Sequence, residues 1–246
     1  MIILIQEYFE SNNIDRSNEI KTVLEFNLNN PNIDYIYLLN EKDEPYIRNL
    51  EQTNNKLHQI VTGSRLTFKK AFEIANFFTG HIIIIANNDI TFTKIGFPNV
   101  QTFENIKKLT DKGVVLATTR HNFDNLEIEG REFSQDSWIF RSPILIPDDT
   151  DFYFGKLSCD TKIAYLLSQF YIVKNYPYDI ITLHLHKSNI RTYSEDDRIH
   201  GPYKTLPFEK LDNIENFSNY KNKNKHLSII LIMVLFLIII FFLKYL

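Results

Sequence analysis

Short apolar runs alternate with amphipathic stretches along the first ninety residues. The predicted strands cover residues 2–5, 35–39, 58–61 and 82–85, and the predicted helices between them cover residues 18–28 and 67–78. Four consecutive isoleucines at 82–85 leave no exposed face, which is typical of a strand buried on both sides of a parallel sheet. In the second helix, Phe68, Phe72, Ala75 and Phe78 form one apolar stripe. This alternation predicts an α/β fold with a mostly parallel sheet flanked by helices and right-handed crossovers.

The pattern continues less regularly after residue 100. Helices are predicted at 103–109 and 159–169, strands at 114–117, 136–140, 144–146 and 180–185, and irregular polar segments at 42–56, 120–133 and 194–224. There is no internal repeat and no sign of a second globular domain. We therefore expect one domain over residues 1–205, followed by a polar tether over 206–226.

Residues 227–243 form an apolar run interrupted only by Ser228. As a helix this run would be about 25 Å long, enough to cross a thin bilayer, with a buried core helix as the alternative. Lys221, Lys223 and Lys225 precede it, and only three residues follow. Because basic flanks stay in the cytosol, we expect a single-pass tail anchor with the domain on the cytosolic side.

Composition narrows the function classes. The chain has 246 residues, with 27 Lys and Arg against 30 Asp and Glu, so no global basic field indicates nucleic-acid binding. The single cysteine, Cys159, excludes an internal disulfide and is compatible with a reducing compartment.

The first candidate for chemistry is Asp89, which ends the segment Asn87-Asn88-Asp89 directly after the run at 82–85. Ligands of open α/β folds bind beyond the carboxyl ends of the strands, where this segment is expected. The alternative is an ordinary Asx-rich turn.

Two later groups could meet Asp89 above the sheet. Strand alternation predicts Thr182, His184 and His186 on one face, and Asp160 lies in the first turn of the helix at 159–169. Carboxylate and imidazole are ligand types that Mn²⁺ or Mg²⁺ accepts, and diphosphate oxygens would complete the shell. Asp160 could act as a general base on a sugar hydroxyl. The alternatives are a solvated strand face for the histidines and a helix-capping charge for Asp160.

The ordered blocks ANNDI, SQDSWIF, CDTKIAYLL and HLHKSNIRTY resemble a glycosyltransferase-like family of the GT-A type, over about residues 1–205. The resemblance implies a GT-A-like fold, a nucleotide-sugar donor and a divalent metal. Asn87, Asn88 and Asp89 stand where that family has an Asp-x-Asp motif that holds the metal and the donor diphosphate. The resemblance also implies that His184 or His186 supplies another metal ligand.

The acceptor side follows from the same resemblance. Asp160 matches the acidic residue that opens a later helix and acts as the acceptor base. Within residues 134–140, Asp136 and Trp138 would contact the acceptor, because a flat indole can stack on a sugar face. Arg191 could bind the donor phosphates, or pair with Glu195 or Asp196 at the surface.

The chain also departs from the family pattern. Asn87 replaces the first motif Asp and removes one negative charge from the expected metal site, and Cys159 stands where the base motif often has Glu.

We expect a membrane-anchored glycosyltransferase that moves a sugar from a nucleotide-sugar donor to a hydroxyl of a glycan, protein or lipid, with no nucleic-acid partner. The alternative is an inactive GT-A-like domain that binds a nucleotide sugar or glycan as a membrane-tethered scaffold. A metal hydrolase using His184 and His186 is a third hypothesis, disfavoured because the chain lacks the further His and Asp clusters of a two-metal site.

Overall fold

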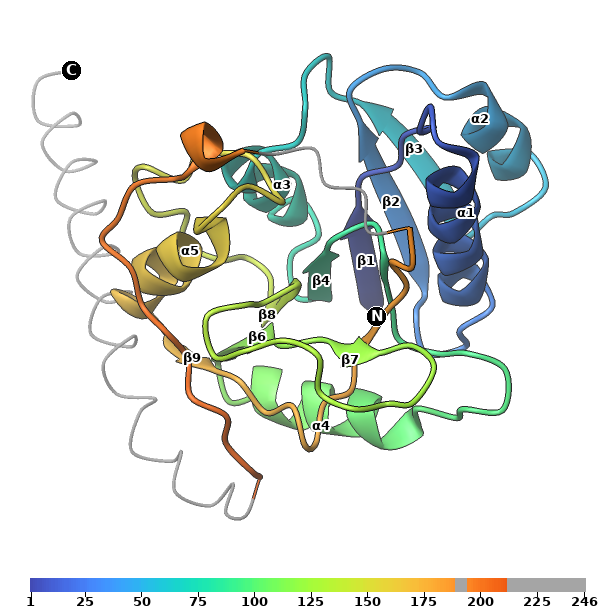
Figure 1. Cartoon of the computed structure of the whole chain (residues 1–246). Coiled ribbons are helices and arrows are strands. Elements are labelled where there is room, and N and C mark those ends of the chain that lie inside the picture. The colour runs from blue at the N-terminus through green and yellow to red at the C-terminus, as the bar shows by residue number, and fades with distance from the viewer. Residues whose placement is uncertain (189–193, 212–246) are drawn as a thin grey trace, which may run out of the picture. The chain divides into compact units, whose positions relative to one another are not determined.

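A computed structural model describes residues 1–188 and 194–211 (Figure 1). Contacts divide the chain into residues 1–211 and 212–246, and only the first unit is described below. Arg191, most of the predicted tether and the apolar run at 227–243 lie outside the described residues. Within the described ranges, no helix has the length and apolar content needed to cross a bilayer.

Helices and strands alternate along the chain as the sequence predicts. The strands are β1 (Ile2–Gln6), β2 (Tyr35–Asn40), β3 (Leu57–Val61), β4 (Ile82–Ala86), β5 (Ile90–Thr91), β6 (Val114–Thr118), β7 (His121–Asn122), β8 (Ser137–Arg141), β9 (Ile172–Lys174) and β10 (Leu183–His184). The helices are α1 (Ile14–Leu28), α2 (Pro45–Glu51), α3 (Phe68–Ala75), α4 (Val100–Thr110) and α5 (Cys159–Ser168), with a short 3₁₀ turn at Glu195–Asp197.

The main sheet has the strand order β3-β2-β1-β4-β8-β6-β9 (Figure 1). All neighbouring pairs are parallel except those of β8, which runs antiparallel to β4 and to β6. A small second sheet has the order β5-β10-β7. The observed fold is thus mixed α/β with a mostly parallel sheet, as predicted.

The central strands are buried on both faces. Ile3 and Ile83 belong to a core cluster that includes the apolar residues of α3 and α5. Residues that alternate with them, such as Leu4 and Ile84, are fully buried on the opposite face, and α4 contacts β6 and β8 there. Because helices cover both faces, polar groups can gather only where the strands end.

Three segments differ from the prediction. The expected strand at 144–146 is wrong: Ile144 N–H donates to Asn76 Oδ1 and Leu145 N–H to the hydroxyl of Tyr171, so side chains replace a strand partner. Helix α2 lies in the segment that was expected to be irregular. Ile47 is its only buried residue, so the segment has no apolar periodicity from which a helix could be predicted. The predicted strand at 180–185 is shortened to β10.

Candidate functional site

A cavity of about 510 Å³ lies where β1 and β4 end. It brings together all but one of the described residues that the sequence marks for function: Asn87, Asn88, Asp89, Asp136, Asp160, His184 and His186. These residues come from four separate parts of the chain and lie close together at the carboxyl edge of the sheet.

The turn that carries Asp89 is fixed by two buried amides. Gln6 Nε2 at the end of β1 donates to the carbonyls of Asn87 and Ile90, at 2.8 and 3.0 Å. Asn27 of α1 donates to the same Ile90 carbonyl at 3.0 Å and accepts from the hydroxyl of Thr91 at 2.9 Å. The turn is therefore held from β1 and from α1 before any ligand binds.

Asp89, His184 and His186 form the centre of the site. Their ligand atoms all lie within 4.8 Å of one another, and His184 Nε2 and His186 Nδ1 are each 3.5 Å from Asp89 Oδ2. The Leu185 N–H donates to the Asp89 carbonyl at 3.0 Å, which holds the segment that carries the two histidines against the turn that carries Asp89. The structure thus brings the three predicted metal ligands together.

Two atoms of this group are buried without a hydrogen-bond partner among the described residues: Asp89 Oδ1 and His186 Nε2. A buried unpaired carboxylate oxygen and an unpaired imidazole nitrogen are costly unless a ligand satisfies them. With the imidazole of His184, this donor set suits a divalent ion such as Mn²⁺ or Mg²⁺ that completes its shell with oxygens.

Asp89 and His184 carry opposite charges within this group. Burial raises the pKa of Asp89, but hydrogen bonds from His184 and His186 and the nearby charge of Arg16 outweigh it, so the pKa lies well below the usual range. Burial likewise lowers the pKa of His184, yet its contacts with Asp89 and Glu129 raise that pKa to about 9. The Asp89 carboxylate therefore stays ionised.

Glu129 is a site residue for which no role was predicted, in the segment 120–133 that was expected to be irregular. Its Oε2 lies 3.2 Å from His184 Nδ1. A carboxylate on the outer imidazole nitrogen fixes the orientation of the ring, with Nε2 facing Asp89. Nothing in the local sequence marks Glu129, because its position follows from the loop between β7 and β8.

Arg16 is a second residue that sequence reasoning missed. From the first turn of α1, its guanidinium donates to Asp89 Oδ2 at 2.8 Å, to Asn88 Oδ1 at 3.2 Å and to Glu19 Oε2 at 3.2 Å. The arginine is 8% exposed. Burial of this charge so close to Asp89 makes it part of the site.

Asp160 lies on the other side of the cavity, in the first turn of α5 as predicted. The Sγ of Cys159 is 3.2 Å from Asp160 Oδ1. Burial and the charge of Asp136 together raise the pKa of Asp160 to about 8, against smaller lowering effects of Cys159 and Arg120. A carboxyl group with such a pKa is mostly protonated at neutral pH, and its ionised form is a stronger base toward a substrate hydroxyl than an ordinary carboxylate.

Arg120 lies between the two halves of the site. Its Nη1 donates to Asp136 Oδ2 at 3.1 Å and to the hydroxyl of Ser134 at 3.0 Å, while its Nε is 4.0 Å from Glu129 Oε1. The guanidinium thus offsets the negative charge of Asp136 on the acceptor side and of Glu129 on the metal side. No role was predicted for this residue from the sequence.

The role expected for Trp138 is corrected by the structure. Its side chain is 0% exposed and packs edge-on against Phe68 and Phe154, with ring centroids 4.8 and 5.9 Å away. On β8 the side chains alternate between the two faces of the sheet, and Trp138 points into the core. An indole buried in this way cannot stack on a sugar, so Trp138 is a core residue.

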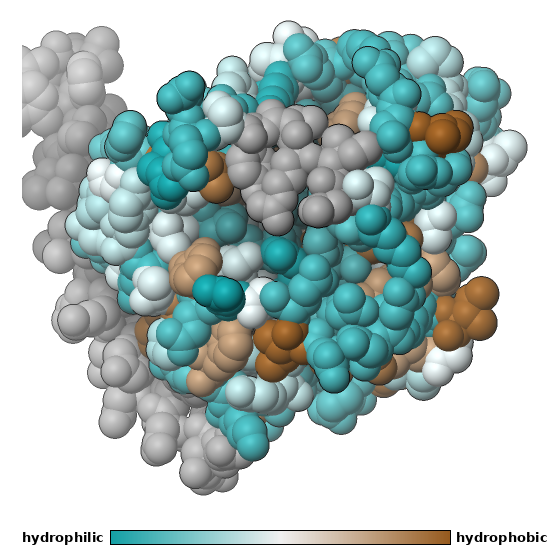
Figure 2. Space-filling model, in the orientation of Figure 1, coloured by the Kyte–Doolittle hydropathy of each residue, from teal (hydrophilic) through white to brown (hydrophobic). Residues whose placement is uncertain are grey.

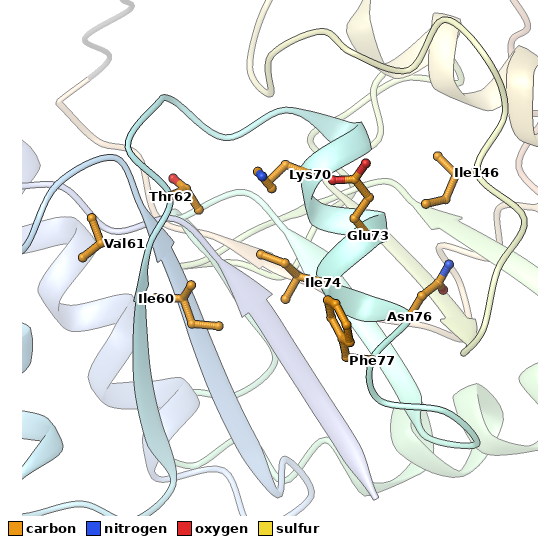
Figure 3. Close-up of a pocket in the computed structure, with 9 residues that line it drawn as sticks. All are labelled: Ile60, Val61, Thr62, Lys70, Glu73, Ile74, Asn76, Phe77 and Ile146. Carbon is orange, nitrogen blue, oxygen red and sulfur yellow. The ribbon is translucent and has the colours of Figure 1, made fainter.

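A second cavity, of about 660 Å³, lies between the end of β3 and α3 (Figure 3). Ile60, Val61, Ile74 and Phe77 line it together with Lys70 and Glu73. It holds no cluster of potential metal ligands among the described residues, which makes it the weaker candidate for chemistry despite its size. Figure 2 shows that the described residues on the face in view are mainly hydrophilic, with apolar residues in small scattered groups.

Comparison with known proteins gives the class of fold. The sequence matches no protein-family model and no curated protein. Among solved structures it is similar to the mannosyltransferase PcManGT from Pyrobaculum calidifontis in complex with GDP-Man and Mn²⁺, with a TM-score of 0.53 and 15% identity over 76% of this chain and 58% of that one. This chain therefore spans somewhat more than half the length of that enzyme.

Two further similarities are weaker. A 4-diphosphocytidyl-2C-methyl-D-erythritol synthase from Anaerococcus prevotii gives a TM-score of 0.44 with 14% identity over 80% of this chain and 93% of that one. Residues 1–349 of S. aureus TarS, in complex with UDP-GlcNAc, give 0.42 with 12% identity over 82% and 59%.

The likeness to the mannosyltransferase, together with the strand order, defines the class of fold. The chain has a GT-A-like α/β fold, as the motif blocks implied.

Proposed function

We propose that this protein is a metal-assisted glycosyltransferase that moves a sugar from a nucleotide-sugar donor to a hydroxyl acceptor. The observation that carries the proposal is one cavity, in a GT-A-like fold, that contains both the Asp89, His184 and His186 cluster and the carboxyl group of Asp160. A metal-binding half and a proton-accepting half are the two parts that such a transfer requires.

Each half has a distinct task. Asp89, His184 and His186 would hold a divalent ion, which supplies Lewis-acid stabilisation of the charge on a departing diphosphate. Asn88 and the guanidinium of Arg16 lie at the same place and can contact donor oxygens. Asp160 would take the proton of the acceptor hydroxyl as that oxygen attacks the sugar, which inverts the anomeric configuration.

The acceptor half of the cavity supports this role for Asp160. Asp136 is held by Arg120 and by Asn87, and its charge contributes to the raised pKa of Asp160. Asp136 and Trp138 were the two predicted acceptor contacts. Trp138 is buried in the core, and Asp136 lines the cavity.

The experiment that tests the proposal incubates the full chain with a panel of nucleotide sugars, with and without Mn²⁺, and measures release of nucleoside diphosphate. We expect metal-dependent release from one donor, slow with water as acceptor. Binding of a nucleotide sugar without release from any donor would support a second candidate, an inactive GT-A-like scaffold. The feature that favours the scaffold is Asn87, which leaves Asp89 as the sole carboxylate of the motif segment.

We also propose, from the sequence alone, that residues 227–243 anchor the protein in a membrane and that the domain faces the cytosol. Resistance of the full chain to alkaline extraction, lost when residues 227–243 are deleted, tests the anchor. Protease accessibility of the domain in sealed microsomes tests its side.

A further inference from the structure

Arg16 and the two histidines predicted to bind the metal all approach the same atom, Asp89 Oδ2. Arg16 Nη2 lies 2.8 Å from Asp89 Oδ2, the oxygen from which His184 Nε2 and His186 Nδ1 are each 3.5 Å away. Asp89 and Arg16 both have nearly buried side chains, with 10% and 9% exposed. The guanidinium therefore compensates the charge of Asp89 inside the cluster that would receive a cation.

A divalent ion bound at this cluster would lie close to the guanidinium. Two positive groups that share one buried carboxylate repel each other more strongly than they would in water, because the surroundings screen the charges poorly. Asn87 adds no second carboxylate to offset this repulsion. Binding of the ion must then weaken the contact between Arg16 and Asp89.

Arg16 has a second partner already in place. Its Nη1 is 3.2 Å from Glu19 Oε2, one turn further along α1. Glu19 in turn accepts from the N–H and the hydroxyl of Ser188, at 2.7 and 2.8 Å, two residues after His186. The guanidinium can therefore release Asp89 and remain paired with Glu19, while Glu19 keeps the histidine segment against α1.

We propose that Arg16 is a built-in competitor of the metal, so that a divalent cation binds weakly by itself and fully only with an anionic ligand. The diphosphate of a nucleotide donor would provide such an anion: it bridges to the metal and gives Arg16 a new partner. The identity of the anion rests on the proposed function, but the competition between Arg16 and the cation for Asp89 does not.

The test titrates Mn²⁺ alone into the full chain, without nucleotide, and follows binding by calorimetry or by the electron paramagnetic resonance signal of free Mn²⁺. The variants are Arg16→Gln, Arg16→Lys and Arg48→Gln. Arg48 is a half-exposed arginine of α2 that is paired with Asp43 and Glu51 and does not line the cavity, so its replacement removes the same charge outside the site.

We expect Arg16→Gln to bind Mn²⁺ about tenfold more tightly than the wild type, or better. Arg48→Gln should leave the affinity unchanged. Arg16→Lys keeps the charge with a shorter reach, so its affinity should lie between, about threefold above the wild type. It also keeps the inference testable if Arg16→Gln fails to fold.

The inference would be overturned if a folded Arg16 variant bound Mn²⁺ no more tightly than the wild type does. It would also be overturned if no variant bound Mn²⁺. Donor turnover is measured separately on the wild type. If the Arg16 variants bind Mn²⁺ with unchanged affinity and the wild type turns over a donor, only the proposed competition is refuted. If they bind Mn²⁺ more tightly but the wild type turns over no donor, only the glycosyltransferase proposal is refuted.

Discussion

Asn87 and Asp136 are joined by two hydrogen bonds: Asn87 Nδ2 donates to Asp136 Oδ1 at 3.1 Å, and the Asn87 N–H donates to the Asp136 carbonyl at 3.0 Å. The pair ties the turn that carries Asp89 to the start of β8 and hence to the acceptor half of the site. An amide at position 87 can donate to Asp136, whereas the carboxylate of a complete Asp-x-Asp motif would repel it.

This relationship predicts the effect of restoring the motif. Asn87→Asp places two carboxylates in contact, so the free energy of unfolding without metal should fall by about 1–2 kcal/mol. Because a cation compensates the added charge, Mn²⁺ should stabilise Asn87→Asp more than the wild type. Thermal unfolding with and without Mn²⁺ measures both effects.

Asn88→Asp is the matched control for that prediction. Asn88 uses its side-chain oxygen to accept from Arg16, which an aspartate also does, so this variant should lose little stability. Equal losses in the two variants would show that the contact with Asp136 is not what favours an amide at position 87.

Glu129 is predicted to be a positioning residue for His184. Glu129→Ala removes the acceptor that holds Nδ1 and should lower Mn²⁺ affinity by about 10–100-fold, whereas Glu129→Gln keeps an acceptor and should lose much less. Calorimetric titration with Mn²⁺ distinguishes the variants without any assay of turnover. Wild-type affinity in Glu129→Ala would rule out this role.

The raised pKa of Asp160 predicts a dependence of stability on pH. Its ordinary value is 3.8 and its value in the folded protein is about 8, so between these limits the folded state holds a proton that the unfolded state has lost. The contribution of Asp160 to stability therefore declines as pH rises from about 4 to about 8 and is constant above that range.

Asp160→Asn removes this decline. Relative to the wild type, the variant should gain about 2 kcal/mol or more in free energy of unfolding between about pH 4 and about pH 9. Urea unfolding at the two pH values measures the gain. A difference between the proteins that does not vary with pH would mean that Asp160 ionises normally.

Asn27 is predicted to be a stability residue that supports the site from a distance. It is 0% exposed, and four hydrogen bonds connect it to Gln6, Ile90, Thr91 and Phe92. Asn27→Ala leaves several of these groups unpaired and should cost about 2–4 kcal/mol in urea unfolding. Asn55→Ala, at an exposed position, is the control and should cost almost nothing.

The fold was predictable because its signals are local. The isoleucine run of β4, the phenylalanine stripe of α3 and the alternation of strands and helices each follow from a few neighbouring residues. The same holds for Asp89 at the end of β4 and Asp160 in the first turn of α5, since their positions on elements are set by those local patterns.

The partners of these residues were not predictable in the same way. Arg16 reaches Asp89 across 73 positions of sequence and Glu129 reaches His184 across 55, so only the tertiary packing makes them neighbours. Trp138 was assigned to the acceptor side because the family resemblance places residues 134–140 there. Pairing of β8 between β4 and β6 instead buries residues 137–140, and Trp138 points into the core.

The most direct test of the central claim compares Asp89→Asn with the wild type in metal-dependent release of nucleoside diphosphate from a nucleotide sugar, using the full chain and Asp43→Asn as an exposed control. Asp89 is the residue on which the metal half of the site depends. We expect Mn²⁺-dependent release by the wild type and by Asp43→Asn, and loss of that release in a folded Asp89→Asn. Equal release by all three proteins, or release that does not depend on Mn²⁺, would contradict the role of Asp89 in a metal-assisted transfer.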